Sequence, residues 1–120
     1  MDCVFCSISV SNYILENEHF FVIEDKHPVS KGHLLIISKR HFEDYFGISA
    51  EESVSLRDIT LKAREHLISR YSPVAFNLGM NCGSHAGQSV FHFHLHLIPR
   101  YTGERRSNLR GLREFIRNTI

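Results

Sequence analysis

Three histidines alternate with apolar residues near the end of the chain, in the run 92–98 (HFHLHLI). In a β-strand His92, His94 and His96 would share one face, with about 6–7 Å between neighbours, and the apolar side chains would share the other. An imidazole near neutral pH acts as nucleophile, acid, base or metal ligand. The spacing predicts a chemically active strand face. Two alternatives stay open: a zinc site held by two of these histidines, and a half-exposed polar face without chemistry.

A loop rich in small residues precedes this strand, in the run 81–89 (NCGSHAGQS). Small residues let backbone N–H groups approach an anion closely. The side chains of Asn81, Gln88 and Ser89 add hydrogen bonds for phosphate or sugar oxygens. A glycine-rich loop alone is more often a plain turn. Its place next to the histidine strand favours a phosphate site.

Two of the three cysteines, Cys3 and Cys6, form a Cys-x-x-Cys pair, while Cys82 has no evident partner. An odd number of cysteines does not suit a disulfide framework, and inside a cell this spacing indicates metal or redox chemistry. A tetrahedral zinc site would need two more ligands from elsewhere. No thioredoxin-like βαβ pattern surrounds the pair. A redox pair and two ordinary cysteines remain alternatives.

Composition limits the class of protein. The chain has 120 residues, 42% hydrophobic side chains and a formal net charge of +1, so we expect one compact domain without a general nucleic-acid-binding field. It has no basic start followed by an apolar run, and no stretch of about 18 apolar residues. A cytoplasmic protein with no membrane or sequence-specific nucleic-acid partner is expected.

The elements that must position these residues read as an antiparallel α+β domain. Strands are predicted over 19–25 and 33–38, joined by a turn with Pro28 and Gly32, and over 74–80 and 90–98, the last ended by Pro99. One long helix is predicted from the capping box at 49–52 to about residue 71. Its apolar stripe comprises Ile59, Ala63 and Leu67, with Val54 and Leu56 as further candidates. An arginine-rich tail over 103–113 is expected at the surface, and 112–120 forms a last helical turn or lies along a partner.

The run 87–98 (GQSVFHFHLHLI) closely resembles the signature of the histidine-triad (HIT) proteins. Supporting matches lie at 20–25, 28–37, 39–41 and 76–81, so the resemblance covers nearly the whole chain. It implies a single HIT domain over 1–120. It also implies an antiparallel sheet of about five strands, one long helix and a short terminal helix.

The resemblance implies a two-step reaction at the α-phosphate of a nucleotide. His94 attacks and forms a nucleotidyl-histidine, which water then hydrolyses to a nucleoside monophosphate, expected to be AMP from an adenine nucleotide. The substrate would be a dinucleoside polyphosphate or a nucleoside phosphoramidate. His96 would contact the phosphate and leaving-group oxygens, Gln88 and Ser89 the phosphate, and the carbonyl of His92 would orient the nucleophile. Related nucleotidyltransferases have glutamine at the third triad position, so His96 favours hydrolysis over transfer.

The same resemblance implies a nucleoside site nearer the N-terminus. Asp25 matches a residue that binds ribose hydroxyls, and His33 and Asn81 match other site positions. The base pocket would be lined by four apolar residues: Phe5, Ile8, Ile23 and Leu35. Without the resemblance these four would be ordinary core residues.

Bacterial-type HIT proteins with a Cys-x-x-Cys near the start, a branch resembling the dinucleoside polyphosphate hydrolases, hold a structural Zn²⁺. Its four ligands map onto Cys3, Cys6, His41 and His92. The family also implies a homodimer whose sheets join edge to edge. One departure is the missing second glycine in the run 110–113 (RGLR). Two other functions stay open: a nucleotide-binding regulatory or scaffold protein, and a zinc-dependent hydrolase that uses the triad as ligands.

Overall fold

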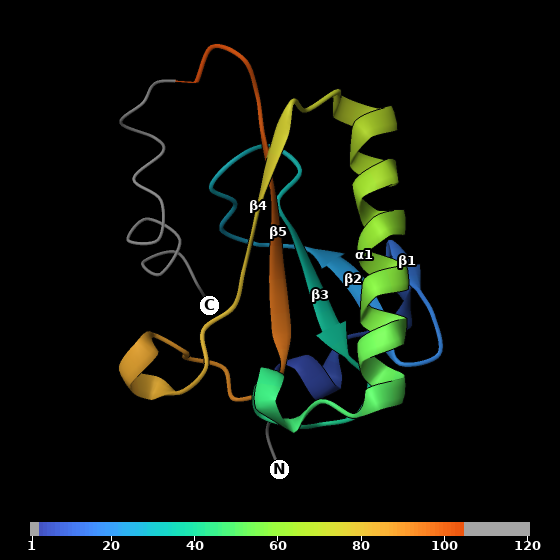
Figure 1. The fold of residues 1–120 in the computed structure, drawn as a ribbon, viewed down its shortest axis with the longest axis vertical. Helices are drawn as coiled ribbons and strands as arrows, with labels where there is room; N and C mark the ends of the chain where they lie inside the picture. Colours follow the sequence, from blue (N-terminus) through green and yellow to red (C-terminus); the bar gives the residue numbers. More distant parts are fainter. Residues whose placement is uncertain (1–2, 105–120) are drawn as a thin grey trace.

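The computed structural model describes residues 3–104, so the predicted helical turn at 112–120 and most of the arginine-rich tail lie outside the described residues. Figure 1 shows the main elements around one sheet. In chain order they are η1 (Phe5–Ser7), η2 (Val10–Asn12), β1 (Leu15–Glu16), β2 (Phe20–Glu24), β3 (Leu34–Ser38), η3 (Tyr45–Gly47), α1 (Ala50–Tyr71), β4 (Ala75–Gly79), η4 (Ser84–Ala86) and β5 (His94–Arg100).

The strands form one five-stranded antiparallel sheet in the order β1-β2-β3-β5-β4. The predicted α+β class, with one long helix, is confirmed. β2, β3 and β4 each begin and end within one residue of the predicted limits. The sequence did not predict β1, because a strand of two residues is too short to show alternation.

The prediction for the histidine strand was wrong at both ends. β5 begins at His94, not at Val90, so His92 lies before the strand. It also continues through Pro99 to Arg100. Proline lacks an N–H, but none is needed at this position. The main-chain groups of Pro99 point towards β3, and β3 pairs with β5 only as far as Leu34 with Leu97, so no hydrogen bond of the sheet is lost. The Pro99 carbonyl accepts a hydrogen bond from the Ser30 hydroxyl at 2.5 Å instead.

Helix α1 begins at a complete capping box. The Ser49 hydroxyl accepts from the Glu52 N–H, and the Glu52 carboxylate accepts from the Ser49 N–H. The stripe that faces the sheet is Leu56, Ile59, Ala63 and Leu67. Val54 does not belong to it, since this side chain is 72% exposed. The helix ends at Tyr71, and its C-cap Ser72 has a left-handed backbone (φ 55°) and donates its N–H to the carbonyl of Ile68.

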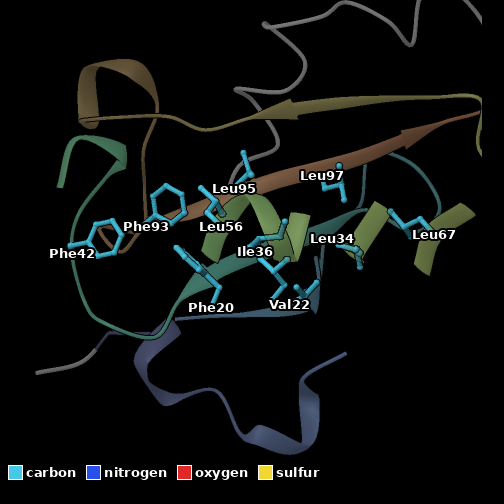
Figure 2. Close-up of a cluster of buried hydrophobic side chains, with 12 residues drawn as sticks. Phe20, Val22, Leu34, Ile36, Phe42, Leu56, Leu67, Phe93, Leu95 and Leu97 are labelled. Atoms are coloured by element: carbon cyan, nitrogen blue, oxygen red, sulfur yellow. The ribbon is translucent and has the colours of Figure 1, made fainter. Parts of the chain in front are cut away.

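Two apolar clusters lie on opposite faces of the sheet. The main core lies under α1 (Figure 2). Its side chains from the sheet are Phe20 and Val22 of β2, Leu34 and Ile36 of β3, Phe93 before β5, and Leu95 and Leu97 of β5. On the other face, Phe21, Leu35 and Ile37 pack against Phe5 of the N-terminal segment. Each buried side chain of this size contributes about 1.5–3 kcal/mol. The described part of the chain contains no helix long and apolar enough to cross a membrane.

Candidate active site and metal centre

β5 carries His94 and His96 on the sheet face that α1 does not cover. In the register of the sheet, His94 pairs with Ile37 and His96 with Leu35, while Leu95 turns to the core under the helix. Both imidazoles are almost fully buried, at 5% and 1% exposure. Strand alternation, as expected from the sequence, separates these two histidines from the core side chains.

The hydrogen bonds of His94 determine its tautomer. Its Nδ1 lies 2.8 Å from the main-chain carbonyl of His92, and because a carbonyl only accepts, Nδ1 carries the proton. The lone pair is therefore on Nε2. Burial lowers the pKa of His94 below the ordinary value of 6.5, against the opposing effects of the His92 carbonyl and the Asp25 charge. At neutral pH the ring is neutral and its Nε2 is nucleophilic.

A chain of hydrogen bonds likewise determines the tautomer of His96. The Val29 N–H donates to Nδ1 of His33 at 3.1 Å, so the proton of His33 is on Nε2. That Nε2 lies 2.9 Å from Nδ1 of His96 and donates to it. The remaining proton of a neutral His96 is then on its Nε2. The chain from Val29 through His33 makes His96 a hydrogen-bond donor at Nε2.

Burial keeps both of these rings neutral. It lowers the pKa of His33 to about 4, with a smaller contribution from the Arg100 charge and an opposing one from Asp25. Burial, and then the charges of His94 and His33, lower the pKa of His96 to about 2. The acceptor role of His33 Nδ1 requires the same neutral form.

Asp25 lies beside these two histidines. One carboxylate oxygen accepts from the His27 N–H at 2.8 Å, and the other lies 3.3 Å from His33 Nε2 and 3.6 Å from His96 Nδ1. The side chain has no exposed surface. The sequence placed Asp25 and His33 in the site but did not predict that they touch. Ribose binding by Asp25 stays a prediction, and it requires the carboxylate to turn outward.

His92 belongs to a second cluster, with Cys3, Cys6 and His41. Its Nε2–H donates to the Ser38 carbonyl at 2.7 Å, which leaves the Nδ1 lone pair available. Nδ1 lies 3.3 Å from Cys3 Sγ, 3.5 Å from Cys6 Sγ and 3.0 Å from His41 Nδ1. All four ligand atoms lie within 4.8 Å of one another. Ligand atoms of a tetrahedral zinc ion are about 3.3–3.8 Å apart, so two thiols and two imidazoles fit that ion.

The loop between β4 and β5 is held by Gln88. Its amide nitrogen donates to the carbonyls of Glu43 (2.7 Å) and Val90 (3.1 Å), and its oxygen accepts from the Gly83 N–H (2.7 Å). Gly83 and Gly87 adopt φ values of 98° and 101°, which suit glycine alone. Gln88 was predicted to bind phosphate, but these bonds already use both of its amide hydrogens. Ser89 is exposed at the loop surface, and Asn81 is buried.

A cavity of about 470 Å³ opens between the N-terminal segment and the sheet, a size typical of small-molecule sites. Its wall includes all four apolar residues predicted for the base pocket. The full set is Val4, Phe5, Ile8, Asn12, Ile14, Ile23, Glu24, Lys26 and Leu35. The sequence missed the other five, because their place depends on how the N-terminal segment lies on the sheet. The Phe5 ring also meets His94 edge to face, with 5.0 Å between ring centroids, so the cavity adjoins His94.

Comparison with known proteins agrees with this geometry. Residues 9–103 match the model of the HIT domain, and the chain belongs to the HIT family. An uncharacterised HIT-like protein of Mycoplasma genitalium is 40% identical, over 93% of this chain and 87% of its own length. The crystal structure of a HIT family protein from Bacillus anthracis superposes with a TM-score of 0.78 at 34% identity, covering 95% and 89% of the two chains. A zinc-bound histidine triad family protein from Mycobacterium smegmatis gives a TM-score of 0.75 at 29% identity, covering 96% and 93%.

Proposed function

We propose that this protein hydrolyses a nucleotide at its α-phosphate through a covalent intermediate on His94. The substrate is a dinucleoside polyphosphate or a nucleoside phosphoramidate, and the product is a nucleoside monophosphate, AMP for an adenine nucleotide. The observation that carries the proposal is a neutral, buried imidazole beside an apolar cavity, with Nδ1 held by a carbonyl and Nε2 left with its lone pair. A nucleoside in the cavity would direct its 5′-phosphate towards this nitrogen.

In the first step the Nε2 lone pair of His94 attacks the α-phosphorus. An N–P bond forms, the P–O bond to the leaving group breaks (P–N in a phosphoramidate), and its electron pair departs with that group. In the second step a water oxygen attacks the same phosphorus and the N–P bond breaks. The electron pair returns to His94, and one proton of the water passes to solvent. The His92 carbonyl holds Nδ1–H throughout and stabilises the positive charge of the intermediate.

His96 assists by hydrogen bonding. As a neutral ring with its proton on Nε2, it donates to an oxygen of the phosphate or of the leaving group, where negative charge develops. His33 keeps His96 in this tautomer and is a positioning residue. The exposed Ser89 and the backbone N–H groups of the loop add donors for the phosphate.

We also propose that Cys3, Cys6, His41 and His92 hold a structural Zn²⁺. The donor set and its spacing support the ion, as does the zinc-bound relative from Mycobacterium smegmatis. A bound zinc would supply a structural cross-link that uses these four side chains as ligands. It would tie the N-terminal wall of the cavity to His92, whose carbonyl accepts from His94 Nδ1.

A homodimer built through the β4 edge is the proposed assembly. β4 is an edge strand of the sheet, and Leu78 on it is 54% exposed. An open strand edge with an apolar side chain suits pairing with a second copy. We expect the protein to sediment as a dimer and Leu78→Lys to sediment as a monomer. A wild-type monomer at micromolar concentration would refute this assembly.

The covalent step is tested by rapid quenching during turnover of diadenosine polyphosphates and adenosine phosphoramidate, followed by mass spectrometry of the peptide that contains His94. We expect one added AMP group on His94. In ¹⁸O-labelled water, one label should enter the released monophosphate, because water attacks phosphorus in the second step.

The test variant is His94→Asn. The matched control is His66→Asn, which replaces a histidine of α1 away from the site. His94→Asn should fold and bind AMP while losing turnover by about 10³-fold or more, and His66→Asn should match the wild type. Full turnover in His94→Asn would exclude the nucleophile. Tight AMP binding with no turnover of any substrate in the wild type would instead favour a regulatory binding protein.

A further inference from the structure

The wall of the cavity is mainly apolar, and one stretch of it is polar. Six of its residues, Val4, Phe5, Ile8, Ile14, Ile23 and Leu35, offer only carbon surface. Such a slot holds the faces of a planar ring but does not distinguish one base from another. Base selection requires donors and acceptors at the rim of the ring.

The first polar group is the main chain of Glu24. Asp25 donates its N–H to His33 on the β3 side, and Val22 accepts from Ile14 on the β1 side. Main-chain groups alternate along a strand, so the N–H and C=O of Glu24 point to the β1 side, like those of Val22. β1 ends its pairing before this level, and no described residue hydrogen-bonds to either group. The Glu24 side chain lies on the other face of the sheet, with Phe20 and Val22.

The second polar group is the side-chain amide of Asn12. Asn12 comes two residues before Ile14, whose N–H donates to the Val22 carbonyl of β2, and Asn12 and Glu24 both line the cavity. Asn12 is the last residue of η2, it lines the cavity, and its side chain is exposed. Among residues 3–104, none hydrogen-bonds to its amide. The amide and the Glu24 main chain therefore present unused donors and acceptors along one edge of the slot.

We infer that Asn12, with the Glu24 main chain as its partner, is the residue that selects the adenine base expected of the substrate. The inference rests on the proposed function, because it assumes that a nucleoside occupies the cavity. An asparagine amide pairs with adenine through one donor and one acceptor, matching the ring nitrogen and the exocyclic amine. A carboxylate in its place only accepts, and it suits the two neighbouring N–H donors of guanine.

The test is calorimetric binding of AMP and GMP, which are products and undergo no turnover, to the wild type and to Asn12→Asp. The added negative charge repels the phosphates of AMP and GMP equally, so this repulsion does not change the ratio of the two dissociation constants. We expect the wild type to prefer AMP, and Asn12→Asp to move the ratio towards GMP by about ten-fold or more. Asn12→Ala should bring the ratio close to one. Ser11→Asp, which places the same charge one residue earlier and outside the cavity wall, should leave the ratio at its wild-type value.

Two results would overturn the inference while leaving the proposed function intact. One is AMP and GMP binding with a ratio that Asn12→Asp does not change. The other is an equal change in Ser11→Asp, which would assign the effect to charge alone. Failure of the proposed function appears in a different measurement, because the wild type would then hydrolyse no nucleotide substrate, whether or not it binds AMP. Asn12 is exposed, so loss of folding is not expected, and circular dichroism of each variant checks this.

Discussion

His33 is buried in its neutral form, so acid should destabilise the fold through this side chain. Its pKa is about 4 in the folded protein and about 6.5 in an unfolded chain. Between these pH values the unfolded chain binds more protons, so the free energy of unfolding falls as the pH falls from 6.5 to 4. The full effect is about 3 kcal/mol, of which about 2 kcal/mol is lost between pH 7 and pH 5.

The perturbation that isolates this effect is His33→Gln, which has no imidazole to protonate. Urea unfolding of both proteins at pH 7 and pH 5, with the same free zinc concentration, gives the two free energies at each pH. His33→Gln should be the less stable protein at pH 7, since it loses the hydrogen bonds to Val29 and His96. The gap should shrink by about 2 kcal/mol at pH 5. His66→Gln serves as the matched control and should follow the wild type.

Two observations would refute this reasoning. The first is a His33→Gln variant that loses as much stability between pH 7 and pH 5 as the wild type. The second is direct, from the Cε1–H chemical shift of His33 in an NMR titration: a midpoint at or above pH 6.5 would show that Asp25 outweighs burial. The NMR measurement needs no variant, so it applies even if His33→Gln does not fold.

Three further outcomes follow from the structure. Cys6→Ser should lower the bound zinc measured by atomic emission and lower the melting temperature, whereas a protein with full zinc content would show that Cys6 is not a ligand. Gln88→Leu removes the three hydrogen bonds that hold the loop to Glu43 and to itself, so faster amide exchange over 83–90 and a lower kcat/KM are expected; unchanged exchange would contradict the role of Gln88 as a brace. Ser49→Ala removes the N-cap oxygen that accepts from the Glu52 N–H and should cost about 1 kcal/mol in urea unfolding, and no loss at pH 7 would count against the cap.

Much of the fold was predictable because its signals are local. The capping box at Ser49 and the stripe from Ile59 to Leu67 determine where α1 begins and which side it buries. Short runs of β-prone residues between turn residues located β2, β3 and β4. The start of β5 was not predictable, since the alternation begins at Val90 while the backbone becomes a strand only at His94. There Gln88 binds the Val90 carbonyl, and His92 faces the cysteines instead of a neighbouring strand.

The sequence by itself determined which side chains were available: His94 and His96 on one strand face, a Cys-x-x-Cys pair, and four apolar residues for a pocket. Only the tertiary structure decided what state each is in. The tautomers of His94 and His92 depend on hydrogen bonds to main-chain carbonyls. Every residue type has the same carbonyl, so the sequence does not show which one a histidine contacts. The neutral state of His33 depends on burial between distant segments. The three alternating histidines therefore belong to two different sites. His92 lies in the cluster with Cys3 and Cys6, and His94 and His96 lie on the face of the sheet next to the cavity.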